Sequence, residues 1–257
     1  MSIELRSGTA ADAAACGTIC YEAFKSVNSA HNFPPDFASA EEGRELMAML
    51  LSHPGHHSVV AELDGRIVGS DFMDERAPIY GIGPITVDPA MQNRGTGGQL
   101  MRHMLDRAAS RQAAGVRLLQ TGFHNRSLCF YSLVGFRTRE PISILQGAPL
   151  NQKIAGHDVR PATPVDLMAL IGAATDFGRP GFLVPTRNHE VSTWCLKGGL
   201  RLVYQMTLMT VGLYNEPTDA GCRRCCTERT ISYLPHHRRP ERFSPDALAH
   251  KNGETDR

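Results

Sequence analysis

The stretch Gln92–Gly98, with the sequence Q-N-R-G-T-G-G, decides the fold of this chain. It follows the apolar run Ile82–Val87, which is typical of a strand, and it precedes residues with the periodicity of an amphipathic helix. The first N–H groups of a helix have no partner inside the helix and lie at the positive end of its dipole. A glycine-rich turn at this place lets an anion approach the main chain closely. The sequence therefore predicts a site for a phosphate or diphosphate group.

The spacing of the glycines narrows the kind of site. A P-loop requires Lys followed by Ser or Thr after the last glycine, whereas Gln99 and Leu100 follow here. A dinucleotide fingerprint requires a third glycine where Leu100 stands. What remains is Q-x-x-G-x-G over Gln92–Gly97, preceded by Val-Asp-Pro. This pattern resembles the acyl-CoA loop of the GCN5-related N-acetyltransferase (GNAT) family.

A second motif follows at a suitable distance, with one predicted helix and one predicted strand between the two. The stretch Asn125–Phe136 is typical of a short helix that ends at Gly135 and is followed by a strand. Asn, then an aromatic-Tyr pair, then Gly-Phe is similar to a pattern of the same family. The resemblance implies that Tyr131 is the general acid that protonates the departing thiolate of coenzyme A.

The resemblance covers roughly residues 2–148 and implies an α/β fold, with a mixed (α+β) sheet that splays at its centre and is flanked by helices. It implies acetyl-CoA as co-substrate, with the diphosphate on main-chain N–H groups of the loop and the pantetheine arm along the splayed strand. The residues to which it gives a cofactor-binding role are Ile85, Thr86, Val87, Gln92, Asn93, Arg94, Gly95, Thr96, Gly97, Gly98, Asn125 and Phe130.

The general base stays open, because the predicted strand from Ile79 to Val87 carries no Glu, the residue that many family members use there. Four nearby side chains are candidates: Asp74, Glu75, Tyr80 and His124.

Beyond the first domain, placed at residues 1–150, the chain contains a faint repeat. Arg6–Asp12 and Arg160–Asp166 both read R-x-x-T-x-x-D, and Trp194–Arg201 parallels Phe130–Arg137 with Cys195 in the place of the tyrosine. No counterpart of the glycine loop accompanies it. We therefore expect residues 151–217 to be a degenerate, truncated GNAT-like half. Residues 218–257 contain little that a core could bury, so we expect a disordered tail.

Composition narrows the choice of partner and compartment. The chain has 257 residues and a net charge of +1, which gives no indication of a nucleic-acid or membrane partner. Its seven cysteines and the lack of a signal sequence at the N-terminus indicate free thiols in the cytoplasm. The Cys and His residues between Cys222 and His237 lack the spacing of a zinc site, so no metal is expected.

Two functions remain open at this stage. The first is an N-acetyltransferase that passes the acetyl group of acetyl-CoA directly to a primary amine of a small molecule or protein. The second is a non-catalytic acyl-CoA-binding sensor or partner subunit. The degenerate half is expected to serve either a homodimer or the selection of the acceptor amine.

Overall fold

The computed structural model describes residues 3–147 and 182–214, and these residues divide into two compact units. The first unit contains the chain up to Thr138 together with Met209–Tyr214, and the second contains Arg139–Leu208. Each unit is described by itself. The predicted tail, the repeat at Arg160–Asp166 and the cluster from Cys222 to His237 lie outside the described residues.

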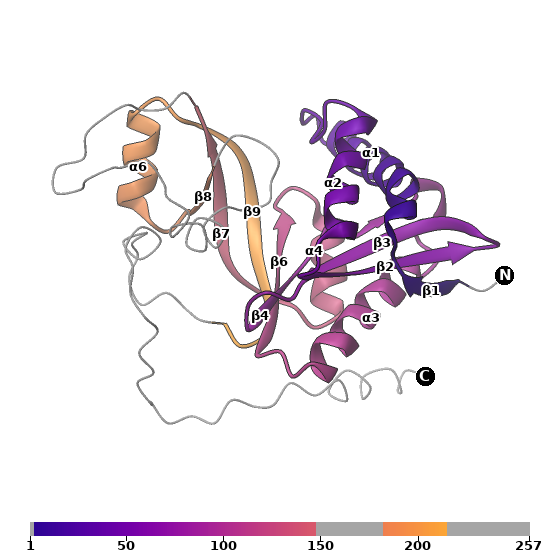
Figure 1. Ribbon diagram of the computed structural model, residues 1–257. Helices are drawn as coiled ribbons and strands as arrows, with labels where there is room; N and C mark the ends of the chain where they lie inside the picture. Colours follow the sequence, from indigo (N-terminus) through magenta and orange to yellow (C-terminus); the bar gives the residue numbers. More distant parts are fainter. Residues whose placement is uncertain (1–2, 148–181, 215–257) are drawn as a thin grey trace, which may run out of the picture. The chain divides into compact units, whose positions relative to one another are not determined.

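The elements follow one another in this order along the chain (Figure 1): β1 Glu4–Ser7, η1 Ala10–Asp12, α1 Ala13–Ala30, α2 Ala40–Ser52, β2 His56–Leu63, β3 Arg66–Asp74, β4 Ile79–Ile82, β5 Thr86–Val87, η2 Pro89–Met91, α3 Thr96–Ser110, β6 Gly115–Thr121, α4 Asn125–Leu133, β7 Arg137–Gln146, β8 Phe182–Pro185, α6 His189–Lys197 and β9 Arg201–Gly212.

The first unit is a mixed sheet with helices on both faces. Its strands β1, β2, β3 and β4 are antiparallel neighbours, β4 and β6 are parallel, and the end of β9 lies beside β6. The hairpin of β2 and β3 turns at Asp64-Gly65, where both residues have a positive φ, as an Asp-Gly hairpin turn requires. The mixed sheet confirms the predicted fold class.

Two separate cores hold the helices against the sheet. Helices α1 and α2 pack on one face around Cys16, Met47 and Phe72, and α3 packs on the other around Leu100 and Met104 (Figure 1). This division follows from the period-2 alternation of side chains along each strand.

The predicted strand from Ile79 to Val87 is broken into two short strands, and the break shapes the site. Strand β4 pairs with β6 through Ile79–Gly81, whereas β5 pairs with β3, Thr86 opposite Ser70. Within the described ranges, no ladder joins β5 to β6. The strands therefore separate after Gly81, and backbone groups of β5 and of the last half of β6 are left for another partner.

The second unit contains β7, β8, the first part of β9 and helix α6. Strand β8 pairs with β7 in antiparallel fashion, and Leu145, Val184, Cys195 and Leu200 form a small core. Here the end of α6 has the same local hydrogen bonding as the end of α4. Leu200 N donates to Cys195 O at 3.1 Å, as Phe136 N donates to Tyr131 O at 2.9 Å.

The glycines confirm this likeness at the local level. Gly199 directly precedes Leu200, and Gly135 directly precedes Phe136. Their φ values are 93° and 100°. The paralleled stretches thus form the same helix end and the same turn into a strand. That residues 151–217 are a degenerate half stays a prediction, and the contact-based boundary at Arg139 lies earlier than the predicted domain end at residue 150.

Candidate functional site

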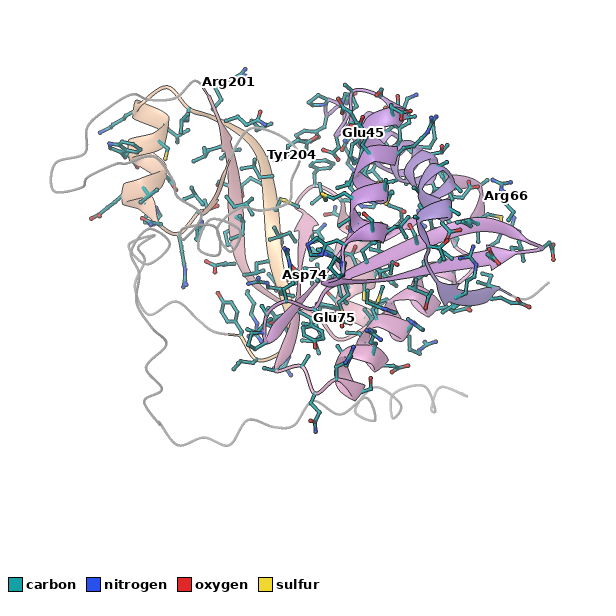
Figure 2. The ribbon with its side chains drawn as sticks, in the orientation of Figure 1. Glu45, Arg66, Asp74, Glu75, Arg201 and Tyr204 are labelled. Carbon is teal, nitrogen blue, oxygen red and sulfur yellow. The ribbon has the colours of Figure 1, made fainter. Side chains whose placement is uncertain are left out.

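The glycine loop is held in shape by side chains around its entrance. The carboxylate of Asp88 binds the guanidinium of Arg66, which lies at the hairpin end of β3 (Figure 2), and accepts the N–H of Ala90 at 3.0 Å. Gln92 donates from Nε2 to the carbonyl oxygen of Val87 at 3.3 Å. These bonds fix the turn that carries the chain from β5 to α3.

Helix α3 begins directly after a left-handed residue. Gly95, its N-cap residue, has φ 84° and ψ −3°, and it supplies no side-chain cap. Because the N–H groups of Thr96, Gly97 and Gly98 have no intrahelical acceptor, they are available to an anion. An added Cβ at Gly98 would meet nothing within 4 Å, so this face of the helix start is open.

A cavity of about 560 Å³ lies beside this helix start, within the first unit. Its size is typical of small-molecule sites. The cavity begins at the glycine loop, continues between the separated strands β5 and β6, and ends at the last turns of α1. Its walls come from α1, β4, β5, the glycine loop, β6 and α4.

Most of the residues that the sequence assigned to the site line this cavity. They are Ile85, Thr86, Val87, Gln92, Asn93, Gly95, Thr96, Gly97, Gly98, Phe130 and Tyr131. Arg94 and Asn125 do not line it, and both are exposed. In the described structure these two side chains therefore give no geometric support to a cofactor-binding role.

Arg126 was not singled out by the sequence reasoning, although it lies inside the second motif. Its guanidinium donates to Gln92 Oε1 at 2.9 Å and to Asn93 Oδ1 at 2.6 Å. Two hydrogen bonds from one planar group fix the glycine loop to the first turn of α4. Nothing in the local sequence signals this contact, since its partners are more than thirty positions away.

Tyr131 lies between the cavity and the core on the α3 side of the sheet. Its ring packs on Phe130 and Phe136, with centroids 5.3 Å and 6.1 Å away. Burial raises the pKa of its phenol well above the usual range, and the carboxyl group of Asp71 acts in the same direction. The hydroxyl group is therefore protonated at neutral pH and able to donate a proton.

Asp71 is a second group that the sequence reasoning missed. It is fully buried on β3; its Oδ1 accepts the N–H of Phe72 at 2.8 Å, and its Oδ2 has no hydrogen-bond partner among the described residues. Burial raises the pKa of this carboxyl group well above its ordinary value. The sequence of β3, R-I-V-G-S-D-F-M-D, does not indicate which of its polar residues is fully buried.

Of the four candidates for the general base, His124 is the one that lines the cavity. Asp74 binds Arg76, and Glu75 binds Arg107, both at the far end of β3 (Figure 2). Burial lowers the pKa of the His124 imidazole, and His31 and Arg126 act in the same direction. The ring is therefore neutral at physiological pH and can accept a proton.

Three buried polar atoms in the walls of this cavity have no hydrogen-bond partner among the described residues. They are Asn28 Nδ2, Thr96 Oγ1 and Gln120 Oε1, on residues that are 2%, 1% and 1% exposed. Buried polar groups are nearly always hydrogen-bonded, and leaving one unpaired costs about 1–3 kcal/mol. The described residues therefore leave these three polar atoms unsatisfied.

The described residues contain neither a metal-binding cluster nor a membrane-spanning helix. Within residues 3–147 and 182–214, no group of three His, Cys, Asp or Glu side chains lies close enough together to hold a metal ion. Within the same ranges, every helix is too short or too polar to cross a bilayer.

The family comparison agrees with the two motifs. Residues 54–138 match the family described as the acetyltransferase (GNAT) domain. This range contains β2 to α4, and with them the glycine loop and Tyr131. A search of curated proteins gives no significant match.

Solved structures share the fold at low sequence identity. A putative acetyltransferase from Pyrococcus horikoshii superposes with a TM-score of 0.60 at 14% identity, over 82% of this chain and 90% of that one. Ribosomal-protein-alanine N-acetyltransferase from Brucella melitensis gives 0.50 at 14% identity, over 82% and 99%. A GNAT family acetyltransferase from Brucella melitensis in complex with acetyl-CoA is 27% identical over 53% and 83%, with a TM-score of 0.40.

Proposed function

We propose that this chain, whose residues 54–138 match the GNAT acetyltransferase domain, transfers the acetyl group of acetyl-CoA directly to a primary amine. The observation that carries this proposal is a single cavity that is lined both by the open start of α3 and by Tyr131. One end of the cavity suits a diphosphate, and the other suits an amine.

The residues present fit acetyl-CoA as co-substrate. The N–H groups of Thr96, Gly97 and Gly98 would hold the diphosphate, and a phosphate oxygen would supply the partner that the buried Thr96 Oγ1 lacks among the described residues. The separated backbone groups of Thr86 and Val87 would pair with the amides of the pantetheine arm. The thioester is already activated, so the protein needs to position it and to move two protons.

His124 and Tyr131 are the groups that we assign to those protons. The amine nitrogen would attack the thioester carbonyl, which forms the C–N bond and an oxyanion; collapse of the oxyanion then breaks the C–S bond. The neutral His124 takes the proton that leaves the amine, and Tyr131 gives its proton to the thiolate. A main-chain N–H at β5 would stabilise the oxyanion between these two steps.

The free cysteines of the chain are compatible with a reducing compartment. Cys16, Cys20, Cys129 and Cys195 are free among the described residues, and Cys129 is exposed. Exposed free thiols are typical of the reducing cytoplasm, which we propose as the location.

The assay that tests the proposal measures free coenzyme A thiol while acetyl-CoA and a panel of amines are present. We expect thiol release that depends on an amine, together with an acetylated amine detected by mass spectrometry. If acetyl-CoA binds and no amine on the panel is acetylated, the chain is instead a non-catalytic acyl-CoA-binding protein, which is the second candidate.

A further inference from the structure

Asn28 is a buried polar group of the cavity that does not belong to the cofactor loop, since it comes from the last turns of α1. Its backbone carbonyl is occupied, because it accepts the N–H groups of His31 at 3.1 Å and Phe33 at 2.9 Å. Its side chain is 2% exposed and lines the cavity, and Nδ2 has no partner among the described residues. A buried amide donor of this kind is costly unless a ligand accepts its hydrogen.

The cavity around Asn28 is apolar apart from a few groups. Phe24 and Val27 line it from α1, and Leu119 lines it from β6. His124 lines it from the turn before α4, and the ring of His31 lies 6.1 Å from that of His124. This end of the cavity therefore combines the Asn28 donor, the unpaired acceptor Gln120 Oε1, one neutral imidazole and apolar walls.

We propose that the acceptor is an α-amino amide with an apolar side chain, and that Asn28 binds the carbonyl oxygen beside the amine through Nδ2. This inference rests on the proposed function and names the substrate class of the same site. The uncharged Nδ2 donor matches a neutral oxygen better than a carboxylate, whose charge it would leave uncompensated on burial. Phe24 and Val27 then contact the apolar side chain of the acceptor.

The imidazole of His124 supports the same substrate class by a separate argument, which concerns the pKa of the amine. An amine next to a carbonyl has a pKa of roughly 7.7–8.0, against about 10.4 for an alkyl amine such as that of lysine. A neutral histidine with a lowered pKa is a weak base, so it deprotonates the first kind of amine far more readily. Asn28 would thus select acceptors that have a carbonyl oxygen beside the amine, and His124 would select acceptors whose amine has a low pKa.

Kinetics with matched acceptors test this proposal on the full chain. Leucinamide and 3-methylbutylamine differ by the carboxamide alone, and leucinol carries a hydroxymethyl group in place of the carboxamide. We expect the wild type to prefer leucinamide over both. Asn28→Ala should lower kcat/KM for leucinamide about tenfold or more and change that for 3-methylbutylamine less than about threefold, since sites built to bind a polar group discriminate strongly against its absence.

Variants are compared by the ratio of kcat/KM for leucinamide to kcat/KM for 3-methylbutylamine. This ratio removes the contribution of the amine pKa, which is the same for every variant. Ser26→Ala, an exposed change on the same helix, is the matched control and should leave the ratio unchanged. Asn28→Asp is nearly isosteric and lacks the donor, so it should show the same selective loss if Asn28→Ala does not fold. An equal fall for both amines, or an unchanged ratio, overturns the proposal.

A titration with acetyl-CoA separates this inference from the proposed function. If the wild type binds acetyl-CoA and acetylates alkyl amines without preferring leucinamide, the substrate class is wrong and the acetyltransferase stands. The substrate class is also wrong if acetyl-CoA binds and neither amine reacts. If the wild type does not bind acetyl-CoA at all, the proposed function itself fails.

Discussion

Arg126, in the first turn of α4, donates a hydrogen bond of 2.6 Å to Asn93 Oδ1 in the glycine loop. A second bond from the same guanidinium reaches Gln92 Oε1 at 2.9 Å. The helix that carries Tyr131 thus also fixes the loop that we assign to the diphosphate. One side chain couples the two halves of the site.

This coupling predicts the effect of Arg126→Ala. Without the guanidinium the loop gains freedom that binding must remove again, so we expect the Kd for acetyl-CoA to rise about three- to tenfold, which is modest because the bonds are exposed. Isothermal titration measures the change, and Arg102→Ala, an exposed change on α3, is the control. An unchanged Kd for Arg126→Ala would show that the loop is shaped without this contact.

Replacing two glycines of the loop by alanine should have different effects. One change should weaken the binding of acetyl-CoA, and the other should stabilise the fold. Gly95 has φ 84°, so Gly95→Ala strains the turn at a cost of about 1–2 kcal/mol and should weaken acetyl-CoA binding about tenfold. Gly98 lies inside α3 with open space around it, so Gly98→Ala should raise the free energy of unfolding by about 0.5–1 kcal/mol. Urea unfolding and titration check both. Equal effects of the two changes on binding would contradict the assigned geometry.

The role of Tyr131 predicts a loss of turnover without a loss of binding. Tyr131→Phe removes the proton donor and keeps the ring that packs on Phe136, so kcat should fall by about 10²–10⁴ while the Kd for acetyl-CoA stays within about twofold. Tyr21→Phe on α1 is the matched control. Because the pKa of the Tyr131 phenol is raised, activity should not decline near pH 10 through this group. Full turnover in Tyr131→Phe would remove it from the mechanism.

A histidine pair outside the site predicts a pH dependence of stability. Nε2 of His57 and Nε2 of His103 lie 3.4 Å apart. Burial lowers the pKa of His57 to about 4; Arg107, His103 and Arg111 act in the same direction, and Glu75 opposes them. An unfolded histidine has a pKa of about 6.5, so between these values the unfolded chain binds a proton that the folded chain does not.

The free energy of unfolding should therefore fall as the pH drops from about 6.5 to about 4, and level off below. We expect a loss on the order of 1–2 kcal/mol, since water partly screens this ring. Urea unfolding between pH 7.5 and pH 4 measures it. His57→Gln removes the titrating group and should flatten this part of the curve; a variant with the wild-type slope would show that other groups cause the loss.

The sequence predicts those features that local signals encode. Gly95 and Gly135 fall at a helix start and a helix end where a left-handed residue is needed, and both have positive φ. The fold that these two places predict is confirmed, and residues 54–138 match the GNAT acetyltransferase domain. The strand breaks after Gly81, close to Pro84, which cannot donate to a ladder. The roles of the individual site residues stay predictions.

The parts that the sequence did not predict depend on contacts between distant segments. Arg126 becomes informative only when its partners in the loop are known. Asn28 sits in an ordinary helix, and its importance follows from its burial in the cavity without a partner among the described residues. Asp71 is similar, because a strand sequence does not say which of its polar residues ends up fully buried.

The central claim is that main-chain N–H groups at the start of α3 bind the diphosphate of acetyl-CoA. Titration of the full chain with acetyl-CoA, compared with S-acetylpantetheine, tests it most directly, because the second compound keeps the thioester arm and lacks the diphosphate together with the 3′-phosphoadenosine that it carries. We predict one site for acetyl-CoA and an affinity for S-acetylpantetheine that is roughly a hundredfold weaker, about 2.7 kcal/mol. Equal affinities, or no heat of binding from millimolar acetyl-CoA, would contradict the claim.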